Sequence, residues 1–284
     1  MKYAFVEAHR SECSVKKMCT VLEVSRSGYS CWRKRNPSRR EVQNRELTKE
    51  IRRIHQESRG VYGSPRITEE LRENGKKVGE NRVARLMKIE RIQGVMPRKF
   101  KVQTTDSNHS FPAAPNLLNQ DFSASEPNRI WVSDLTYIRT ESGFGYLCAV
   151  KDLYDDVIVG WSYASHMRTE MVLEALRSAV FKRKPGAGLI FHSDRGSQYA
   201  SDDFREELKV FGFEQSMSGK GNCYDNAKIE SFFARLKIEE VHRRRYRNHR
   251  EAKENLFDYI EVFYNRRRRH SRLNYLSPIE FSDC

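Results

Sequence analysis

Residues 131–137 read Trp-Val-Ser-Asp-Leu-Thr-Tyr and place one carboxylate, Asp134, inside a β-branched and aromatic run. The run has the composition of a strand, but an acid in its middle is disfavoured by propensity. Residue choices that cost local stability tend to mark functional positions. We therefore expect a strand here, with Asp134 kept for its chemistry.

Strands and helices alternate on the C-terminal side of this run. Strands are predicted over 130–139, 144–153, 157–163, 189–193 and 213–217, and helices over 169–184, 201–211 and 222–242. Three strands, helix, strand, helix, strand, helix is the order of a ribonuclease-H-like fold. The predicted class is an α/β core with a mixed five-stranded sheet and helices, preceded by α-helical, helix-turn-helix-like regions.

A second acid, Asp194, ends the buried strand 189–193 in His-Ser-Asp-Arg-Gly-Ser-Gln, residues 192–198. Acids at the ends of neighbouring strands can converge on one point. A strand-end aspartate can also serve only to start a turn, so both interpretations stay open for this residue alone.

A third acid, Glu230, lies on the helix predicted over 222–242, beside an apolar stripe of Ile229, Phe232, Phe233 and Leu236. If the stripe packs on the sheet, Glu230 is presented at its edge, toward the strand ends. Lys237 follows two turns later, roughly 10 Å along the axis, where a lysine could meet a neighbouring phosphate. An ordinary surface Glu and Lys is the alternative.

Three acids at one point suit metal-dependent phosphodiester chemistry. Two metal ions about 3.5–4 Å apart can activate a nucleophile and stabilise a leaving oxyanion. Mg²⁺ prefers a few carboxylates, retained waters and phosphate oxygens. We therefore predict two Mg²⁺ (or Mn²⁺) ions held by Asp134, Asp194 and Glu230, and no organic cofactor.

The overall composition agrees with a nucleic-acid partner. The 284 residues carry 52 Lys and Arg against 38 Asp and Glu, a net charge of +14, which favours a polyanion. Six cysteines occur without a C-x-x-C pair, so a zinc finger is not expected and a reducing compartment fits. No apolar stretch approaches the roughly 18 residues of a membrane span, and we expect a cytoplasmic protein.

Five regions are predicted along the chain. Residues 1–40 form a small helix-turn-helix-like region, 41–96 a helical, helix-turn-helix-like DNA-binding domain, 97–128 a proline-containing linker, 129–242 the catalytic core, and 243–284 a basic helical extension. In the first region Ser25 is expected to cap a helix, and in the second Ser64 is expected to cap a helix that has Pro65 at its first position.

Basic residues near the acids and beyond the helix 222–242 are predicted to contact DNA. Charge runs are usually solvated faces, but their density here, with Tyr246 and Tyr264 nearby, favours phosphate contacts. The predicted contacts, in addition to Lys237, are Arg195, Lys220, Arg243, Arg244, Arg245, Arg267 and Arg268.

Together these motifs resemble the transposases of bacterial insertion sequences, specifically the second-reading-frame (OrfB) product of the copy-out–paste-in family, which has an integrase-like DDE core. Fifty-nine residues separate Asp134 from Asp194, and 35 separate Asp194 from Glu230. The flanking motifs match too: Trp-x-x-Asp-Leu-Thr-Tyr at 131–137, His-Ser-Asp-x-Gly-Ser-Gln-Tyr at 192–199, Lys-Gly-Asn-Cys-Tyr-Asp-Asn at 220–226 and Glu-Ser-Phe-Phe at 230–233. The likeness covers nearly the whole chain.

The resemblance implies that the three acids are the catalytic, metal-binding triad and that Lys237 contacts DNA near the element's end. It implies hydrolytic nicking at an element end, followed by attack of the freed 3′-hydroxyl on another phosphodiester. The implied partners are double-stranded DNA, further copies of the chain in a synaptic complex, and a first-reading-frame (OrfA) protein, separate or fused. No membrane partner is implied.

One departure from the family is Asp155-Asp156, where relatives commonly have a polar-basic turn; this puts a DNA contact there in doubt. Asp152, nearby, is interpreted as a strand-end residue and not a fourth ligand. Two alternative functions stay open: a ribonuclease-H-like nuclease without strand transfer, and an inactive DNA-binding regulator. The presence of all three acids argues against the second.

Overall fold

A computed structural model of the chain describes residues 1–96, 114–219 and 223–284. Its centre is one five-stranded sheet, ordered β3-β2-β1-β4-β5. The strands are β1 (Ile130–Thr140), β2 (Gly143–Asp152), β3 (Ile158–Ala164), β4 (Ile190–Ser193) and β5 (Glu214–Met217). β1, β2 and β3 pair antiparallel, while β4 runs parallel to both β1 and β5. The mixed ribonuclease-H-like sheet is therefore confirmed, with each strand end within one residue of its predicted place.

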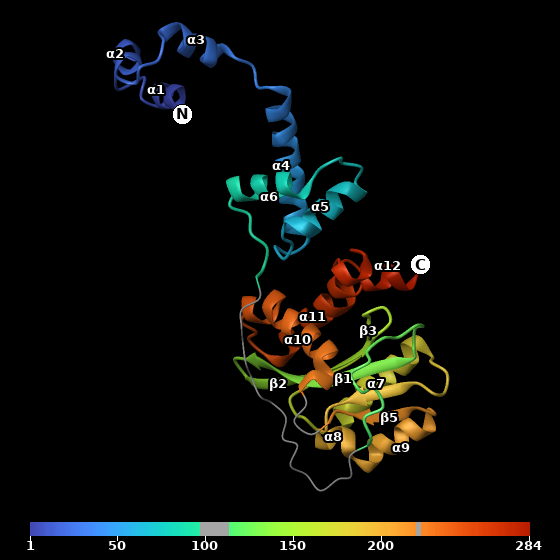
Figure 1. The fold of residues 1–284 in the computed structure, drawn as a ribbon. Helices are drawn as coiled ribbons and strands as arrows, with labels where there is room; N and C mark the ends of the chain where they lie inside the picture. The colour runs from blue at the N-terminus through green and yellow to red at the C-terminus, as the bar shows by residue number, and fades with distance from the viewer. Residues whose placement is uncertain (97–113, 220–222) are drawn as a thin grey trace.

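Helices cover both faces of the sheet (Figure 1) because its buried strands alternate apolar side chains to either side. Trp131 belongs to one apolar cluster and its neighbour Val132 to the other. On the Trp131 face pack α7 (Thr169–Arg183), α8 (Ser197–Ala200) and α9 (Asp202–Val210). On the Val132 face pack α10 (Ala227–Glu239), α11 (His249–Phe257) and a π-helical segment (Asp258–Tyr264).

The approach of α7 to β3 is close enough to require glycine. A Cβ on Gly160 would lie 2.3 Å from the carbonyl oxygen of Ala175. Without that side chain, the helix backbone rests directly on the strand.

The long helix predicted over 222–242 is shorter than expected. A 3₁₀ turn (Cys223–Asn226) precedes α10, and a second one (Val241–Arg243) follows it. The chain closes with a 3₁₀ turn (Ser271–Leu273) and α12 (Pro278–Ser282), whose start carries a capping box between Ser277 and Glu280.

Two helical groups precede the sheet. The first contains α1 (Lys2–Ala8), α2 (Val15–Val21) and α3 (Arg26–Lys34), and it stands apart from the rest in Figure 1 with its own small apolar cluster. The second contains α4 (Arg39–Glu57), α5 (Ser64–Glu73) and α6 (Glu80–Ile89). Ser25 caps α3 as predicted, since its Oγ accepts from the Gly28 amide. Ser64 is instead the first residue of α5, and Gly63 occupies the cap position.

The α4–α6 group contacts the C-terminal segment through specific polar bonds. The Tyr62 hydroxyl donates to the Arg267 carbonyl (3.0 Å) and accepts from the Arg269 amide (2.8 Å). Arg59 pairs with Asp258 (2.5 Å) and reaches Glu240, just beyond α10, at 3.6 Å. The helix-turn-helix-like domain and the helices on the sheet are thus directly joined. In the described parts of the chain, no helix has the length and apolar character needed to cross a bilayer.

Candidate active site

The register of the sheet brings Asp134 and Asp194 to adjacent positions. β1 and β4 are parallel, and Ser133 lies opposite Ser193. The next residues on these neighbouring strands are Asp134, within β1, and Asp194, directly after β4. The Leu135 amide donates to Asp134 Oδ1 (2.8 Å), and the Gly196 amide donates to Asp194 Oδ1 (3.0 Å). Asp194 therefore starts a turn and faces the same edge as Asp134, so both interpretations open at the sequence level apply.

Glu230 reaches this edge from α10. Ile229, Phe232 and Leu236 are buried on the sheet, whereas Glu230 is exposed on the helix's first turn. The start of α10 is tied to β1 because the side-chain Nδ2 of Asn226 donates to the Ser133 carbonyl (3.4 Å). The predicted stripe and the position of Glu230 beside it are confirmed.

The three carboxylates interact electrostatically. Burial raises the pKa of Asp134 well above its ordinary value, and the charges of Asp194 and Glu230 raise it further. Burial and the charge of Asp194 likewise raise the pKa of Glu230. As their side chains stand, however, no three Asp, Glu, His or Cys residues in the described ranges form a ready-made metal cluster. The three acids therefore lie in one region, but in this arrangement their side chains, among the described residues, do not form a single metal-binding cluster.

Lys237 lies on the same side of α10 and near β1. Its Nζ stands 4.5 Å from the ring centroid of Tyr137, three residues after Asp134. Burial lowers the pKa of Lys237, and the charge of Asp134 acts in the opposite direction. The lysine is therefore a half-buried cation at the border of the acidic site, and its contact with DNA stays a prediction.

Several residues that support the site lie in the motifs quoted from the sequence, but no supporting contact was predicted for them. The Tyr199 hydroxyl meets Ser133 Oγ (2.8 Å) beneath β1. Asp225, in the 3₁₀ turn Cys223–Asn226 before α10, accepts from the Gly219 backbone amide (2.7 Å) and from the Asn116 side chain (2.9 Å). Asp225 and Asn226 had a visible signal, since polar residues with short side chains directly precede the apolar stripe.

The predicted basic contacts have different surroundings. Arg243 and Arg245 are exposed, although Arg243 also donates to the Glu239 carbonyl (3.2 Å). Arg244 pairs with Glu240 (2.6 Å), and the half-buried Arg195 donates to the Ser218 carbonyl (2.7 Å). Lys220 lies outside the described residues.

The arginine run at 266–269 requires a correction. Arg267 is exposed, but Arg268 is 1% exposed and its guanidinium makes two bonds to Glu239, of 2.7 and 2.6 Å. The prediction that Arg268 contacts DNA is therefore wrong, because its guanidinium is buried and paired with Glu239. The next residue, Arg269, is also buried and pairs with Glu70 (2.6 Å) and Glu73 of α5.

The acids around the β2–β3 turn have structural partners. Asp155 pairs with Arg183 (2.6 Å), and Asp156 pairs with Lys151 (2.5 Å). Asp152 accepts from the Asn128 amide (2.8 Å) and lies at the end of β2, as its interpretation as a strand-end residue requires. These acids stabilise the fold around the turn.

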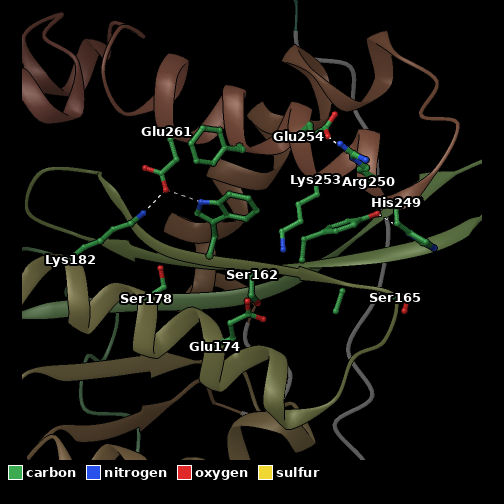
Figure 2. A pocket seen from close by; sticks show the side chains of 14 residues that line it. Ser162, Ser165, Glu174, Ser178, Lys182, His249, Arg250, Lys253, Glu254 and Glu261 are labelled. Carbon is green, nitrogen blue, oxygen red and sulfur yellow. Dashed lines mark hydrogen bonds and ion pairs between the residues drawn. The ribbon is translucent and has the colours of Figure 1, made fainter.

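A cavity of about 810 Å³ lies elsewhere, along β3 between α7 and α11 (Figure 2). Trp161 and Lys182 both reach Glu261 across its wall. None of the three converging acids lines this cavity, so it is separate from the candidate active site.

Comparisons with known proteins agree with this architecture. Residues 124–223 and 230–283 match two models described as integrase core domains, and residues 42–100 match an HTH-like domain. The chain is 47% identical to the insertion element IS600 uncharacterized 31 kDa protein of Shigella sonnei, over 94% of this chain and 97% of that protein. It is 40% identical to transposase InsF for insertion sequence IS3A of Escherichia coli K12, over 100% and 99%.

Two solved structures share only a general likeness. A simian T-cell lymphotropic virus intasome chain gives a TM-score of 0.48 at 11% identity, over 82% of this chain and 74% of that one. The HTLV-2 integrase catalytic core, solved with magnesium, gives 0.42 at 13% identity, over 56% and 99%. The family rests on the full-length relatives and the domain matches: the chain belongs to the IS3 family of insertion-sequence transposases, DNA-transposing proteins with an HTH-like domain and an integrase core.

Proposed function

We propose that this transposase nicks DNA at the ends of its element and joins the freed 3′-hydroxyl to another phosphodiester, with Asp134, Asp194 and Glu230 as the catalytic, metal-binding acids. The observation that carries the proposal is the convergence of three carboxylates, from β1, the end of β4 and α10: the charges of Asp194 and Glu230 raise the pKa of Asp134, and the charge of Asp194 raises the pKa of Glu230. Like charges gathered in this way call for a cation between them.

The donor set fits divalent magnesium or manganese. All three candidate ligands are carboxylates, and hard divalent cations prefer oxygen ligands. When bound, two such ions would activate the attacking oxygen and stabilise the leaving one. Backbone amides already hold one oxygen each of Asp134 and Asp194, so these two acids are oriented by the sheet edge. Glu230 is exposed, and its side chain is free to turn toward them.

The surroundings support a role for basic residues in holding DNA. Lys237 would contact a phosphate beside the reacting one, since it borders Asp134. Arg243, Arg245 and Arg267 are exposed on the C-terminal segment and would contact the backbone farther along, with Lys220 and Arg195 as further candidates. Such binding weakens steeply with salt. The proposed assembly is a synaptic complex of several copies on element ends and target DNA, with a first-reading-frame protein as partner or fusion.

The test uses the full chain and duplexes carrying the element's own terminal inverted repeat. Asp134→Asn and Glu230→Gln should each reduce nicking by more than the roughly 10–100-fold that loss of an outer-shell partner costs, while the affinity for DNA persists. Unchanged nicking in Asp134→Asn would reject the site. A parent protein that binds the duplex but never nicks it, with either metal, would favour the inactive regulator.

A second substrate separates the transposase from a simple nuclease. Duplexes pre-nicked at the element end expose the 3′-hydroxyl, so joining to a target duplex can be followed without the first step. Joined products from the parent, absent in Asp134→Asn, are the expected result. Cleavage of intact ends without any joining of pre-nicked ends would instead favour the nuclease.

A further inference from the structure

A buried ion pair lies at the C-terminal end of the catalytic helix α10. The guanidinium of Arg268 contacts both oxygens of Glu239, at 2.7 and 2.6 Å, and the Tyr259 hydroxyl donates to the same carboxylate at 2.8 Å. The side chains of Arg268 and Glu239 are 1% and 8% exposed. Arg268 comes from the segment that follows the π-helix, so the pair ties two elements that are distant in sequence.

The position of Glu239 on α10 sets what this pair can control. Glu239 follows Glu230 by nine residues and Lys237 by two, which at about 100° per residue places it near the opposite side of the helix from both. It lies instead with the apolar stripe, three residues after Leu236. The buried side of α10 therefore carries the charge of Glu239 at its C-terminal end, while the side that faces the candidate active site carries Glu230 and Lys237.

Apolar packing alone leaves a helix some freedom to turn about its axis, because hydrophobic contacts carry little directional preference. A two-pronged arginine–carboxylate contact does fix direction. The start of α10 has a directional tie of its own, from Asn226 to the Ser133 carbonyl, and Lys151 stands 3.5 Å from the Lys228 carbonyl. The Arg268–Glu239 pair provides the matching tie at the other end.

We propose that Arg268 is a positioning residue that sets the rotation of α10 and thereby the approach of Glu230 to Asp134 and Asp194. The inference rests on the proposed function, because it assigns Arg268 an effect on that same site. A turn of about 10° at the helix's outer radius of ~6 Å moves a side chain by about 1 Å. A displacement of that size at a reacting centre can lower a rate by about a hundredfold.

The main test is the double variant Arg268→Met/Glu239→Gln. It removes both buried charges together, so neither is left unpaired, and such replacements often preserve stability. With element-end duplex and Mn²⁺ both saturating, we expect the single-turnover nicking rate to fall about 10–100-fold, with DNA affinity within about twofold of the parent. The Mn²⁺ concentration for half-maximal rate should rise, an effect that a loss of folded protein alone does not produce. The nicking rate of Arg268→Lys, which keeps the positive charge but not the two-pronged guanidinium, should lie between the rates of the parent and of the double variant.

A matched control changes a similar pair away from α10. Asp155 is fully buried and pairs with Arg183, which is 18% exposed. Arg183→Met/Asp155→Asn should keep the parent's rate and Mn²⁺ dependence per folded molecule. The inference is overturned if the Arg268 double variant is as fast as the parent, or if the control slows equally. Full nicking by Asp134→Asn in the same assay would mark failure of the proposed function itself; an inactive Asp134→Asn beside unaffected Arg268 variants would overturn the positioning role alone.

Discussion

Arg267 and Arg269 are adjacent in an arginine run, and the structure predicts opposite consequences of removing them. Arg269 is buried and holds Glu70 and Glu73 of the helix-turn-helix-like domain, whereas Arg267 points its side chain to solvent. We expect Arg269→Met to loosen that domain from the core without changing the number of phosphate contacts. Arg267→Met should weaken DNA binding and leave the domain contact unchanged.

The free energy that Arg269 contributes to the domain contact follows from the burial of its two partners on α5. The bond to Glu70 (2.6 Å) involves a carboxylate that is 25% exposed. Charge-assisted bonds of this kind contribute about 1.5–3 kcal/mol each, less what water restores to the partner. Glu73 is 57% exposed, so its pairing adds about 0–1 kcal/mol. The expected weakening of the domain contact is about 2–4 kcal/mol.

Two measurements separate the variants. Hydrogen exchange of the α5 amides should accelerate in Arg269→Met and match the parent in Arg267→Met, because α5 carries Glu70 and Glu73. The slope of log affinity for duplex DNA against log salt should become shallower by about 1 in Arg267→Met only.

The opposite pattern would refute this account. If Arg269→Met reduces the salt slope while α5 exchange stays at the parent's rate, Arg269 contacts DNA and the domain contact does not depend on it. If Arg267→Met leaves the slope unchanged, that arginine is solvated and makes no phosphate contact.

Three further outcomes are expected. Burial and neighbouring carboxylates raise the pKa of Asp134 in the folded protein. The metal-free protein should therefore lose stability as pH rises from the ordinary carboxyl pKa through the raised one, and urea titrations should show a smaller loss in Asp134→Asn. Equal pH profiles of stability for the two proteins would contradict this. Gly160→Ala should destabilise by about 1–3 kcal/mol in urea, since its Cβ would meet the Ala175 carbonyl, and an unchanged midpoint would count against that close packing. Lys237→Met should reduce the salt slope for element-end DNA by about 1, with Lys237→Arg restoring it; a slope unaffected by Lys237→Met would remove the lysine from the phosphate contacts.

The sheet could be predicted because its signals are local. Each strand is a short run of β-branched and aromatic residues bounded by turn residues, and these runs suffice to place the strand ends. The convergence of Asp134 and Asp194 could also be predicted, since Asp134 lies within one buried strand and Asp194 directly follows another. What no local signal contains is the register, Ser133 opposite Ser193, that makes the two acids neighbours.

The roles of the arginines could not be predicted in the same way. Residues 266–269 are identical in type, and the difference between an exposed Arg267 and a buried Arg268 depends on Glu239, 29 residues earlier. The π-helical segment was not predicted either, because its buried residues Tyr259, Ile260, Phe263 and Tyr264 lie at a spacing that one face of a regular α-helix also gives. The early end of the helix predicted over 222–242 likewise depends on contacts across the fold, and not on propensity.

The three acids are supported unequally. Asp134 and Asp194 come from paired strands that are joined by backbone hydrogen bonds, whereas the polar contacts cited above that hold the helix of Glu230, among the described residues, are made by side chains. A slight shift of that helix separates the glutamate from the aspartates and leaves the hydrophobic clusters intact. Under the proposed function, such a molecule would keep its folded core and lose nicking, so an inactive transposase of this kind need not be an unfolded one.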